Sequence, residues 1–245
     1  MWNRRLAVRA RSITPKNMSQ YDDQITDEVE GLVRPIYDQI KIWAHGWLHI
    51  EKVVSAAEDL AKIEGVDPVL CKIAAYCHDL GRLEEEQKGL VEPTPASPSP
   101  HAGFGIRPTE EVLRKVGIIK EDAAKIIEAV EIHNLRKYEG NNEIALILQD
   151  ADRTNGFGKM GILRLAVFNC EIPIDEPRNE EDIDREIEQV KEILKSDKVS
   201  RDRMVETLKH VFEWVDVLAN TKSLKNYVQE DYRVNRRFLE EIEKY

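Results

Sequence analysis

Three histidines and two aspartates stand in or at the end of apolar, helix-like segments: His49, His78, Asp79, His133 and Asp152. The chain has 6 histidines, so this set uses half of them. Neutral imidazole and carboxylate together are ligands that suit divalent transition metals. A site of this composition leaves room for water, and a bound metal lowers the pKa of that water toward neutrality. The five residues therefore predict a hydrolytic metal centre, if helices bring them together.

Helical periodicity turns two of the histidines toward the interior. His49 lies one turn before Val53, the first residue of an apolar stripe in the segment 46–63. His78 lies one turn beyond Ala74, in the apolar stripe of the next helix. Both imidazoles are therefore expected on core-facing sides of their helices.

The remaining three members are placed by the same reasoning. His133 continues the stripe of its helix, and Asp152 follows Leu148 by one turn. Asp150 falls nearly opposite Asp152, so periodicity favours Asp152 as the inward carboxylate. Asp79 stands in a last helical turn, where a carboxylate opposes the helix dipole and a bound cation would offset the cost.

The whole chain reads as helical, because no segment shows the sustained alternation of a strand and no internal repeat is present. The predicted fold class is all-α. Residues 86–100 are expected to form a loop, whose Pro-rich stretch is either an insertion or a lid beside the site. We expect helices over about 22–43 (bent near Gly31 and Pro35), 46–63, 67–81, 108–115, 121–135, 143–152, 158–170, 183–194, 204–218 and 224–242.

Composition limits the class of protein. The formal net charge of −10 argues against binding to nucleic-acid polymers or anionic membranes. No apolar run approaches the roughly 20 residues that span a bilayer. Three cysteines are too few and too irregular for a disulfide framework, which favours a reducing, cytoplasmic setting. We interpret them as small core residues.

Two terminal regions stand apart. Residues 1–17 are basic and contain no acid, so we expect residues 1–20 to form a disordered leader; an organelle-type presequence is the alternative. Residues 173–245 form a charged, helical extension. Its apolar stripes are expected to pack on the catalytic core or on a second subunit in a homodimer. His210, in this extension, is expected to be unrelated to the site.

Several short motifs give the chain a resemblance to a known family. Residues 22–170 resemble the HD-domain metal-dependent phosphohydrolase superfamily, in which the order H, HD, D runs over successive helices. The resemblance implies an HD-domain helical bundle over 21–172. It rests on the pieces His49-Ile50-Glu51-Lys52-Val53, Cys77-His78-Asp79-Leu80-Gly81-Arg82, Glu131-Ile132-His133-Asn134 and Gln149-Asp150-Ala151-Asp152-Arg153.

The resemblance implies roles for individual residues. It makes metal ligands of His49, His78, Asp79 and Asp152, with Asp79 bridging metals or orienting the attacking water. It implies that His101 and His133 bind a second metal or a substrate phosphate. Lys52, Arg82 and Arg153 are the basic residues that could hold phosphate charge beside the set. We assign Lys52 and Arg82 to the catalytic group with Asp79, and Arg153 to phosphate or second-metal binding.

The sequence also departs from patterns within the superfamily. Arg82-Leu83 stands where alarmone hydrolases carry Glu-Asp, which argues against that activity. His45 resembles the first histidine of a His-Asp-x-x-His motif, but Gly46 replaces its aspartate. We interpret His45 as a helix-start or packing residue.

The predicted function is hydrolysis of a phosphate ester or anhydride of a small nucleotide or phosphorylated metabolite. The predicted cofactor is one or two divalent ions, of Mn, Fe, Co, Ni, Zn or Mg. Two alternatives stay open: a di-iron oxygenase on the same scaffold, and a non-enzymatic sensor that binds metal or nucleotide.

Overall fold

The computed structural model describes residues 19–90 and 100–245. Within these ranges the regular elements are all helices, which confirms the predicted all-α class. Most of the expected leader and the Pro-rich stretch 92–99 lie outside the described residues. None of the described helices combines the length and the apolar character needed to cross a membrane.

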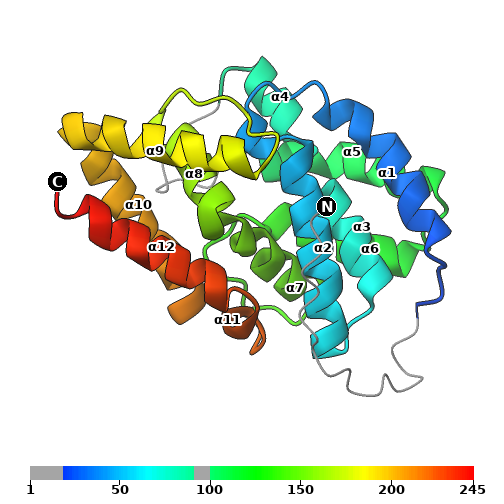
Figure 1. The fold of residues 1–245 in the computed structure, drawn as a ribbon. Helices are drawn as coiled ribbons and strands as arrows, with labels where there is room; N and C mark the ends of the chain where they lie inside the picture. Colours follow the sequence, from blue (N-terminus) through cyan, green and yellow to red (C-terminus); the bar gives the residue numbers. More distant parts are fainter. Residues whose placement is uncertain (1–18, 91–99) are drawn as a thin grey trace.

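The first part of the chain packs around one central helix. Figure 1 shows α3 in the middle of this half, and its neighbours are α1, α2, α6 and α7. A single apolar cluster, from Val29 to Ala151, fills the space between them. The elements are α1 (Gln24–Tyr37), the 3-10 helix η2 (Trp43–His45), α2 (Trp47–Glu64), α3 (Pro68–Cys77), α4 (Arg82–Gln87), α5 (His101–Lys115), α6 (Lys120–Ile132) and α7 (Glu143–Arg153).

The second part has its own apolar cluster, which begins at Phe157 and ends at Ile242. Its helix α8 contacts α9, α10 and α12, and these form the opposite end of the molecule in Figure 1. Thus α8, which the predicted boundary after residue 172 gives to the HD domain, shares its core with the extension. The elements are η3 (Thr154–Gly156), α8 (Gly158–Cys170), α9 (Glu180–Ser196), α10 (Lys198–Asp216), α11 (Leu224–Tyr227) and α12 (Gln229–Ile242).

Polar contacts fasten the second part to the first. The Trp43 indole donates to the carbonyl oxygen of Ile174 at 2.9 Å. The buried Asp150 carboxylate accepts from the backbone N–H groups of Asn220 at 3.0 Å and Thr221 at 2.7 Å. The extension therefore packs on the first part of its own chain.

Helix starts follow the local sequence. The Asp67 carboxylate accepts from the N–H groups of Val69 and Leu70, and Pro68 occupies the first helical position of α3. Asn142 caps α7 in the same way. These caps fix the directions of two helices that end at the candidate site.

Two expectations about the middle of the chain are wrong. Helix α4 runs to Gln87, so residues 86 and 87 are helical rather than the start of a loop, and α5 begins at His101 rather than near Pro108. We read Pro108 as a helix start because proline favours the first turn. In the structure Pro108 lies inside α5, which contacts α1, α4 and α6, and this packing offsets the missing backbone hydrogen bond. The first helix is also shorter than expected and ends at Tyr37.

Gly81 lets the start of α5 approach the turn between α3 and α4. A Cβ atom there would lie 2.0 Å from the carbonyl oxygen of His101 and 2.5 Å from the nitrogen of Gly105. Both are backbone atoms, so neither can move aside by a change of rotamer. The absent side chain therefore lets the start of α5 lie against the segment that follows α3.

We expect Gly81→Ala to lower the free energy of unfolding by about 1–3 kcal/mol, because the added methyl pushes two backbone segments apart. Urea denaturation measures this change. The matched control is Gly103→Ala in α5, where a Cβ meets nothing within 4 Å. That change is expected to stabilise the helix by up to about 1 kcal/mol. Equal effects of the two substitutions would contradict the packing argument.

Candidate metal centre

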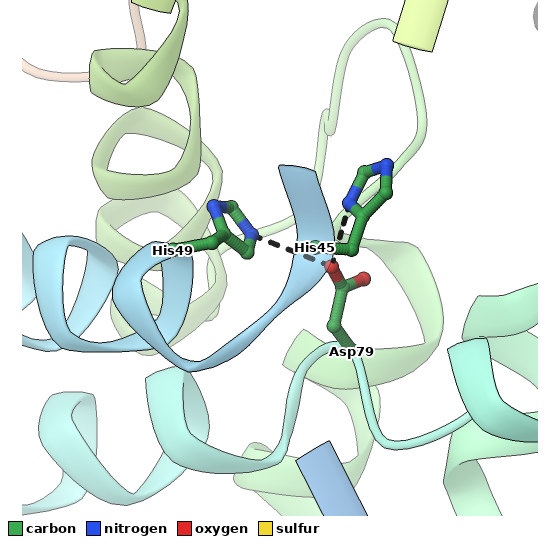
Figure 2. Close-up of side chains that lie close together, drawn as sticks. All are labelled: His45, His49 and Asp79. Carbon is green, nitrogen blue, oxygen red and sulfur yellow. Dashed lines mark ion pairs between the residues drawn. The ribbon is translucent and has the colours of Figure 1, made fainter. Parts of the chain in front are cut away.

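Seven histidine and aspartate side chains converge where the two parts of the molecule meet. They come from η2, from α2, from the ends of α3, α6 and α7, and from the start of α5. All five predicted residues are among them, and Figure 2 shows how three members meet. The cluster consists of His45, His49, His78, Asp79, His101, His133 and Asp152.

Asp79 lies at the centre, and its two oxygens face two different groups. The side chain is only 2% exposed. Around Oδ2 lie His49 Nε2 at 3.3 Å, His45 Nδ1 at 3.4 Å and His78 Nε2 at 3.6 Å. Around Oδ1 lie His101 Nε2 at 3.2 Å, Arg82 Nε at 3.3 Å and His133 Nε2 at 3.6 Å. One carboxylate thus joins two sets of imidazole nitrogens.

Asp152 lies beside the first set. Its Oδ1 is 3.5 Å from His49 Nε2 and 3.8 Å from His78 Nε2. Asp150 points to the other side of α7, where it accepts hydrogen bonds from the chain after Leu218. The helical phase of α7 therefore separates the two aspartates as periodicity predicts.

His78 and His133 are held in the same local way. Each follows the last residue of a helix, and each Nδ1 lies 2.7 Å from a carbonyl oxygen three residues earlier, that of Ala75 or Val130. A carbonyl oxygen can only accept, so the proton is on Nδ1 and the lone pair is on Nε2. This is the tautomer that a metal ligand needs, fixed by the partner of the other ring nitrogen.

His101 has a carboxylate behind it instead of a carbonyl. Its Nδ1 lies 3.7 Å from Oε1 of Glu85, a fully buried residue of α4. Arg82 Nη1 donates to the other Glu85 oxygen at 2.8 Å. Glu85 was not predicted, because no helix was expected over residues 82–87. Its only signal was the i, i+3 spacing from Arg82.

Arg164 of α8 is a second residue that sequence analysis missed. Its guanidinium contacts His49 Nδ1 and Asn155 Oδ1, and Nε donates to the carbonyl oxygen of Ala44 at 2.9 Å. Burial lowers the pKa of Arg164 to about 10, so the group stays charged at neutral pH. Nothing in the sequence links residue 164 to residue 49.

The three basic residues predicted to hold phosphate fall in three different places. Arg82 lies in the site against Asp79. Lys52 is exposed on α2 and does not line the cavity described below. Arg153 borders the cavity, but its guanidinium donates to Asp150, to the carbonyl oxygen of Leu218 and to that of Arg136. Arg153 therefore has a structural contact that we did not predict.

A cavity of about 530 Å³ opens beside the cluster. Its lining includes the clustered histidines and aspartates except His78, together with Arg82 and Arg164. Helix α10 contributes Thr207, His210 and Trp214 to the same lining. The expectation that His210 is unrelated to the site is wrong, since it lines the same cavity.

Burial and charge set the protonation of the cluster. Burial lowers the pKa of His49 and of His101 to about 3, helped by Arg164 and Arg82 respectively. Burial also lowers the pKa of His78. For Asp79, burial raises the pKa, but the charge of Arg82 counters it, and the pKa lies well below its usual range. At neutral pH these imidazoles are neutral and the carboxylate is ionised, as metal binding requires.

Among the residues that the structure describes, three groups could hold a metal ion: His45, His49 and Asp79; His49, His78 and Asp152; and His78, Asp79 and His133. In each group the ligand atoms lie within 4.8 Å of one another. The predicted residues His49, His78, Asp79, His133 and Asp152 all belong to these groups.

Comparison with known proteins places this geometry in a family. Residues 46–155 match the family model of the HD domain. No curated protein sequence matches the chain.

Solved structures share the fold over nearly the whole chain. A Lactobacillus plantarum protein is 17% identical with a TM-score of 0.58, over 91% of this chain and 97% of that one. YpgQ of Bacillus subtilis is 18% identical with a TM-score of 0.57, over 90% and 95%. YpgQ in complex with ADP gives a TM-score of 0.53, at 18% identity over 90% and 94%. HD domains bind divalent metals, and the histidine and aspartate groups lie where the matched segment folds together. Residues 46–155 of this chain therefore form an HD domain.

Proposed function

We propose that this protein is a metal-dependent phosphohydrolase that cleaves a phosphate ester or anhydride of a small nucleotide or phosphorylated metabolite. The observation that carries the proposal is the position of Asp79. Its two oxygens face two histidine sets, and cationic side chains border the same cavity. Such a site suits an anionic substrate next to divalent metal.

The residues present fit two ions. His49, His78 and Asp152, with Asp79 Oδ2, would hold the first, and His101 and His133, with Asp79 Oδ1, the second. The fit rests on the donor set, on the neutral imidazoles and on the Nδ1 hydrogen bonds of His78 and His133. When bound, divalent ions activate water as a nucleophile and polarise phosphoryl oxygens.

The chain's own residues supply orientation and charge. Asp79, ionised and buried, would orient the attacking water and accept its hydrogen bond. Arg82 is placed to hold phosphoryl oxygen, since its Nε lies 3.3 Å from Asp79 Oδ1. Asn155 adds a donor, because its buried Nδ2 has no hydrogen-bond partner among the described residues and the side chain borders the cavity. Lys52 lies outside the cavity, so we propose that Arg164 holds phosphate charge in its place.

The wall formed by α10 would bind the organic part of the substrate. Trp214 and His210 pack edge to face, with centroids 5.9 Å apart, and both line the cavity. Aromatic side chains of this kind stack on planar bases. The fold of YpgQ, which has been solved with ADP, is similar, and this favours a nucleotide over other phosphorylated metabolites.

A di-iron oxygenase is the second candidate. The observation in its favour is the nitrogen-rich donor set, which gives each of two ions at least two imidazoles. Arg82 and Arg164 in the cavity favour the phosphohydrolase, because an oxygenase has no general need for buried cations. Oxygen consumption by the iron-loaded protein separates the two.

The first prediction of the proposal concerns Asp79. Chelation or Asp79→Ala is expected to abolish hydrolysis, since no other carboxylate lies between the two histidine sets. Mass spectrometry measures the metal content, and a screen of nucleotides and phosphorylated metabolites measures the loss of hydrolysis. Turnover that survives Asp79→Ala would falsify the mechanism.

Two neighbouring aspartates of α7 provide the control for this experiment. Asp152→Asn is expected to lower metal content, because Asp152 lies beside His49 and His78. Asp150→Asn is expected to keep the metal and to lower thermal stability, because Asp150 anchors the chain at Asn220. The opposite pattern would mean that the two carboxylates are wrongly assigned.

The second prediction concerns Trp214. Trp214→Leu is expected to raise KM for nucleotide substrates by about 5- to 100-fold, as stacking contributes about 1–3 kcal/mol per base. Trp214→Phe, which keeps a ring, is expected to retain most of the affinity. Hydrolysis of a substrate without a base, such as pyrophosphate, is expected to change little in both variants. An equal loss on both substrate types would exclude base stacking on Trp214.

The third prediction concerns pH. Unfolded histidine titrates near pH 6.5, whereas the pKa of His49 and of His101 is about 3 in the fold. Between these values the unfolded chain binds more protons, so the chelator-treated protein is expected to lose stability as pH falls from 7 to 5. Urea denaturation of wild type and His101→Gln measures the slope. The stability of the variant is expected to depend less steeply on pH, and an equal dependence would contradict the lowered pKa of His101.

A further inference from the structure

His45 occupies a position that the second part of the chain fixes. It ends η2, the 3-10 turn before α2. Arg164 holds this turn through the carbonyl oxygen of Ala44, and the Phe168 ring meets the His45 ring edge to face at 4.5 Å. The imidazole is therefore anchored by α8 rather than free to rotate toward solvent.

Both ring nitrogens of His45 are buried and lack a hydrogen-bond partner within the part of the chain that the structure describes. A buried polar atom without a partner costs about 1–3 kcal/mol. Such atoms are rare in folded proteins, and a functional role or a bound ion is a common reason for them. A pure packing role, which we expected from the sequence, does not explain two unpaired nitrogens.

One of the two nitrogens faces the metal centre. His45 Nδ1 lies 3.4 Å from Asp79 Oδ2, the same oxygen that His49 Nε2 approaches to 3.3 Å (Figure 2). These three atoms all lie within 4.8 Å of one another. Ligands about 2.0–2.2 Å from a shared ion are separated by up to roughly twice that distance. The separations of 3.4 and 3.3 Å between Asp79 Oδ2 and the two histidine nitrogens lie within this limit and suit ligands of one cation.

We propose that His45 is an additional ligand of the first ion, through Nδ1, beside His49 and Asp79. The inference rests on the metal centre of the proposed function and adds a residue to it. Ligation through Nδ1 places the ring proton on Nε2. In Figure 2 this second nitrogen points away from Asp79, and His45 borders the cavity. The same ring would thus bind the ion through Nδ1 and keep its proton on the buried Nε2.

Gly46 is compatible with this role. It follows η2 directly, and a Cβ there would lie 3.2 Å from the carbonyl oxygen of Trp43. The small residue lets the chain turn tightly from η2 into α2, so that His45 and His49 reach the same oxygen. The aspartate that Gly46 replaces in the resembling motif is not needed for this geometry.

The experiment measures metal affinity rather than activity. His45→Ala and His45→Phe are compared with wild type after removal of metal and titration with Co²⁺, against a competing chelator. One of the two ions is expected to bind at least about tenfold more weakly in both variants, with a changed visible spectrum of the bound Co²⁺. The other ion is expected to keep its affinity. His45→Phe preserves the packing on Phe168, which covers the case in which the alanine variant does not fold.

Two further variants make the outcomes distinct. His210→Ala, the histidine outside the cluster, is expected to bind both ions as wild type does, and His78→Ala is expected to lose the first ion. If His45 variants bind Co²⁺ like wild type while His78→Ala does not, the inference about His45 is wrong and the metal centre stands. If wild type itself binds no ion, the proposed function fails together with the inference.

Discussion

The burial of one ionised carboxylate among neutral imidazoles is the constraint that organises this molecule. Asp79 is nearly inaccessible, and burial alone would raise its pKa, yet the charge of Arg82 keeps it ionised. A buried charge is costly unless cations or hydrogen bonds surround it. Here the surroundings on Oδ2 are histidine nitrogens that burial keeps neutral. Divalent metal at this place would supply the charge that these histidines do not carry.

That constraint explains why helix ends, rather than helix middles, meet at the site. His78 and His133 each follow the last residue of a helix, where a free carbonyl oxygen three residues back can accept the Nδ1 proton. His101 begins a helix and has Glu85 behind it. Rigid elements with fixed hydrogen bonds hold ligand nitrogens more accurately than loops would. The arrangement requires a glycine at position 81, because the backbone that follows α3 lies in contact with the backbone at the start of α5.

The sequence predicted what depends on local pattern. Helical periodicity and helix-capping residues were sufficient to predict the all-α class, the start of α3 and the choice of Asp152 over Asp150 on α7. The ordered motifs were sufficient for the family, which the HD-domain match confirms. Residues that act across large sequence separation were missed. Arg164 meets His49, and His210 shares a cavity with Asp79, only because α8 and α10 fold back on the first half. No periodicity carries that information. The place of His45 beside Asp79 could not be foreseen for a related reason, since its buried nitrogens are apparent only once its neighbours are known.

The second part of the chain therefore does more than cover a hydrophobic face. Through Arg164 and Phe168, α8 fixes η2 and hence His45, while α10 closes the cavity with Trp214. Arg153 also links the two parts, since its guanidinium donates to Asp150 of α7 and to the carbonyl oxygen of Leu218, just after α10. A shift of the extension would thus alter both the metal environment and the wall that faces the substrate. Ligand binding on α10 and metal binding at Asp79 are expected to be thermodynamically coupled for that reason, and the coupling must act equally in both directions.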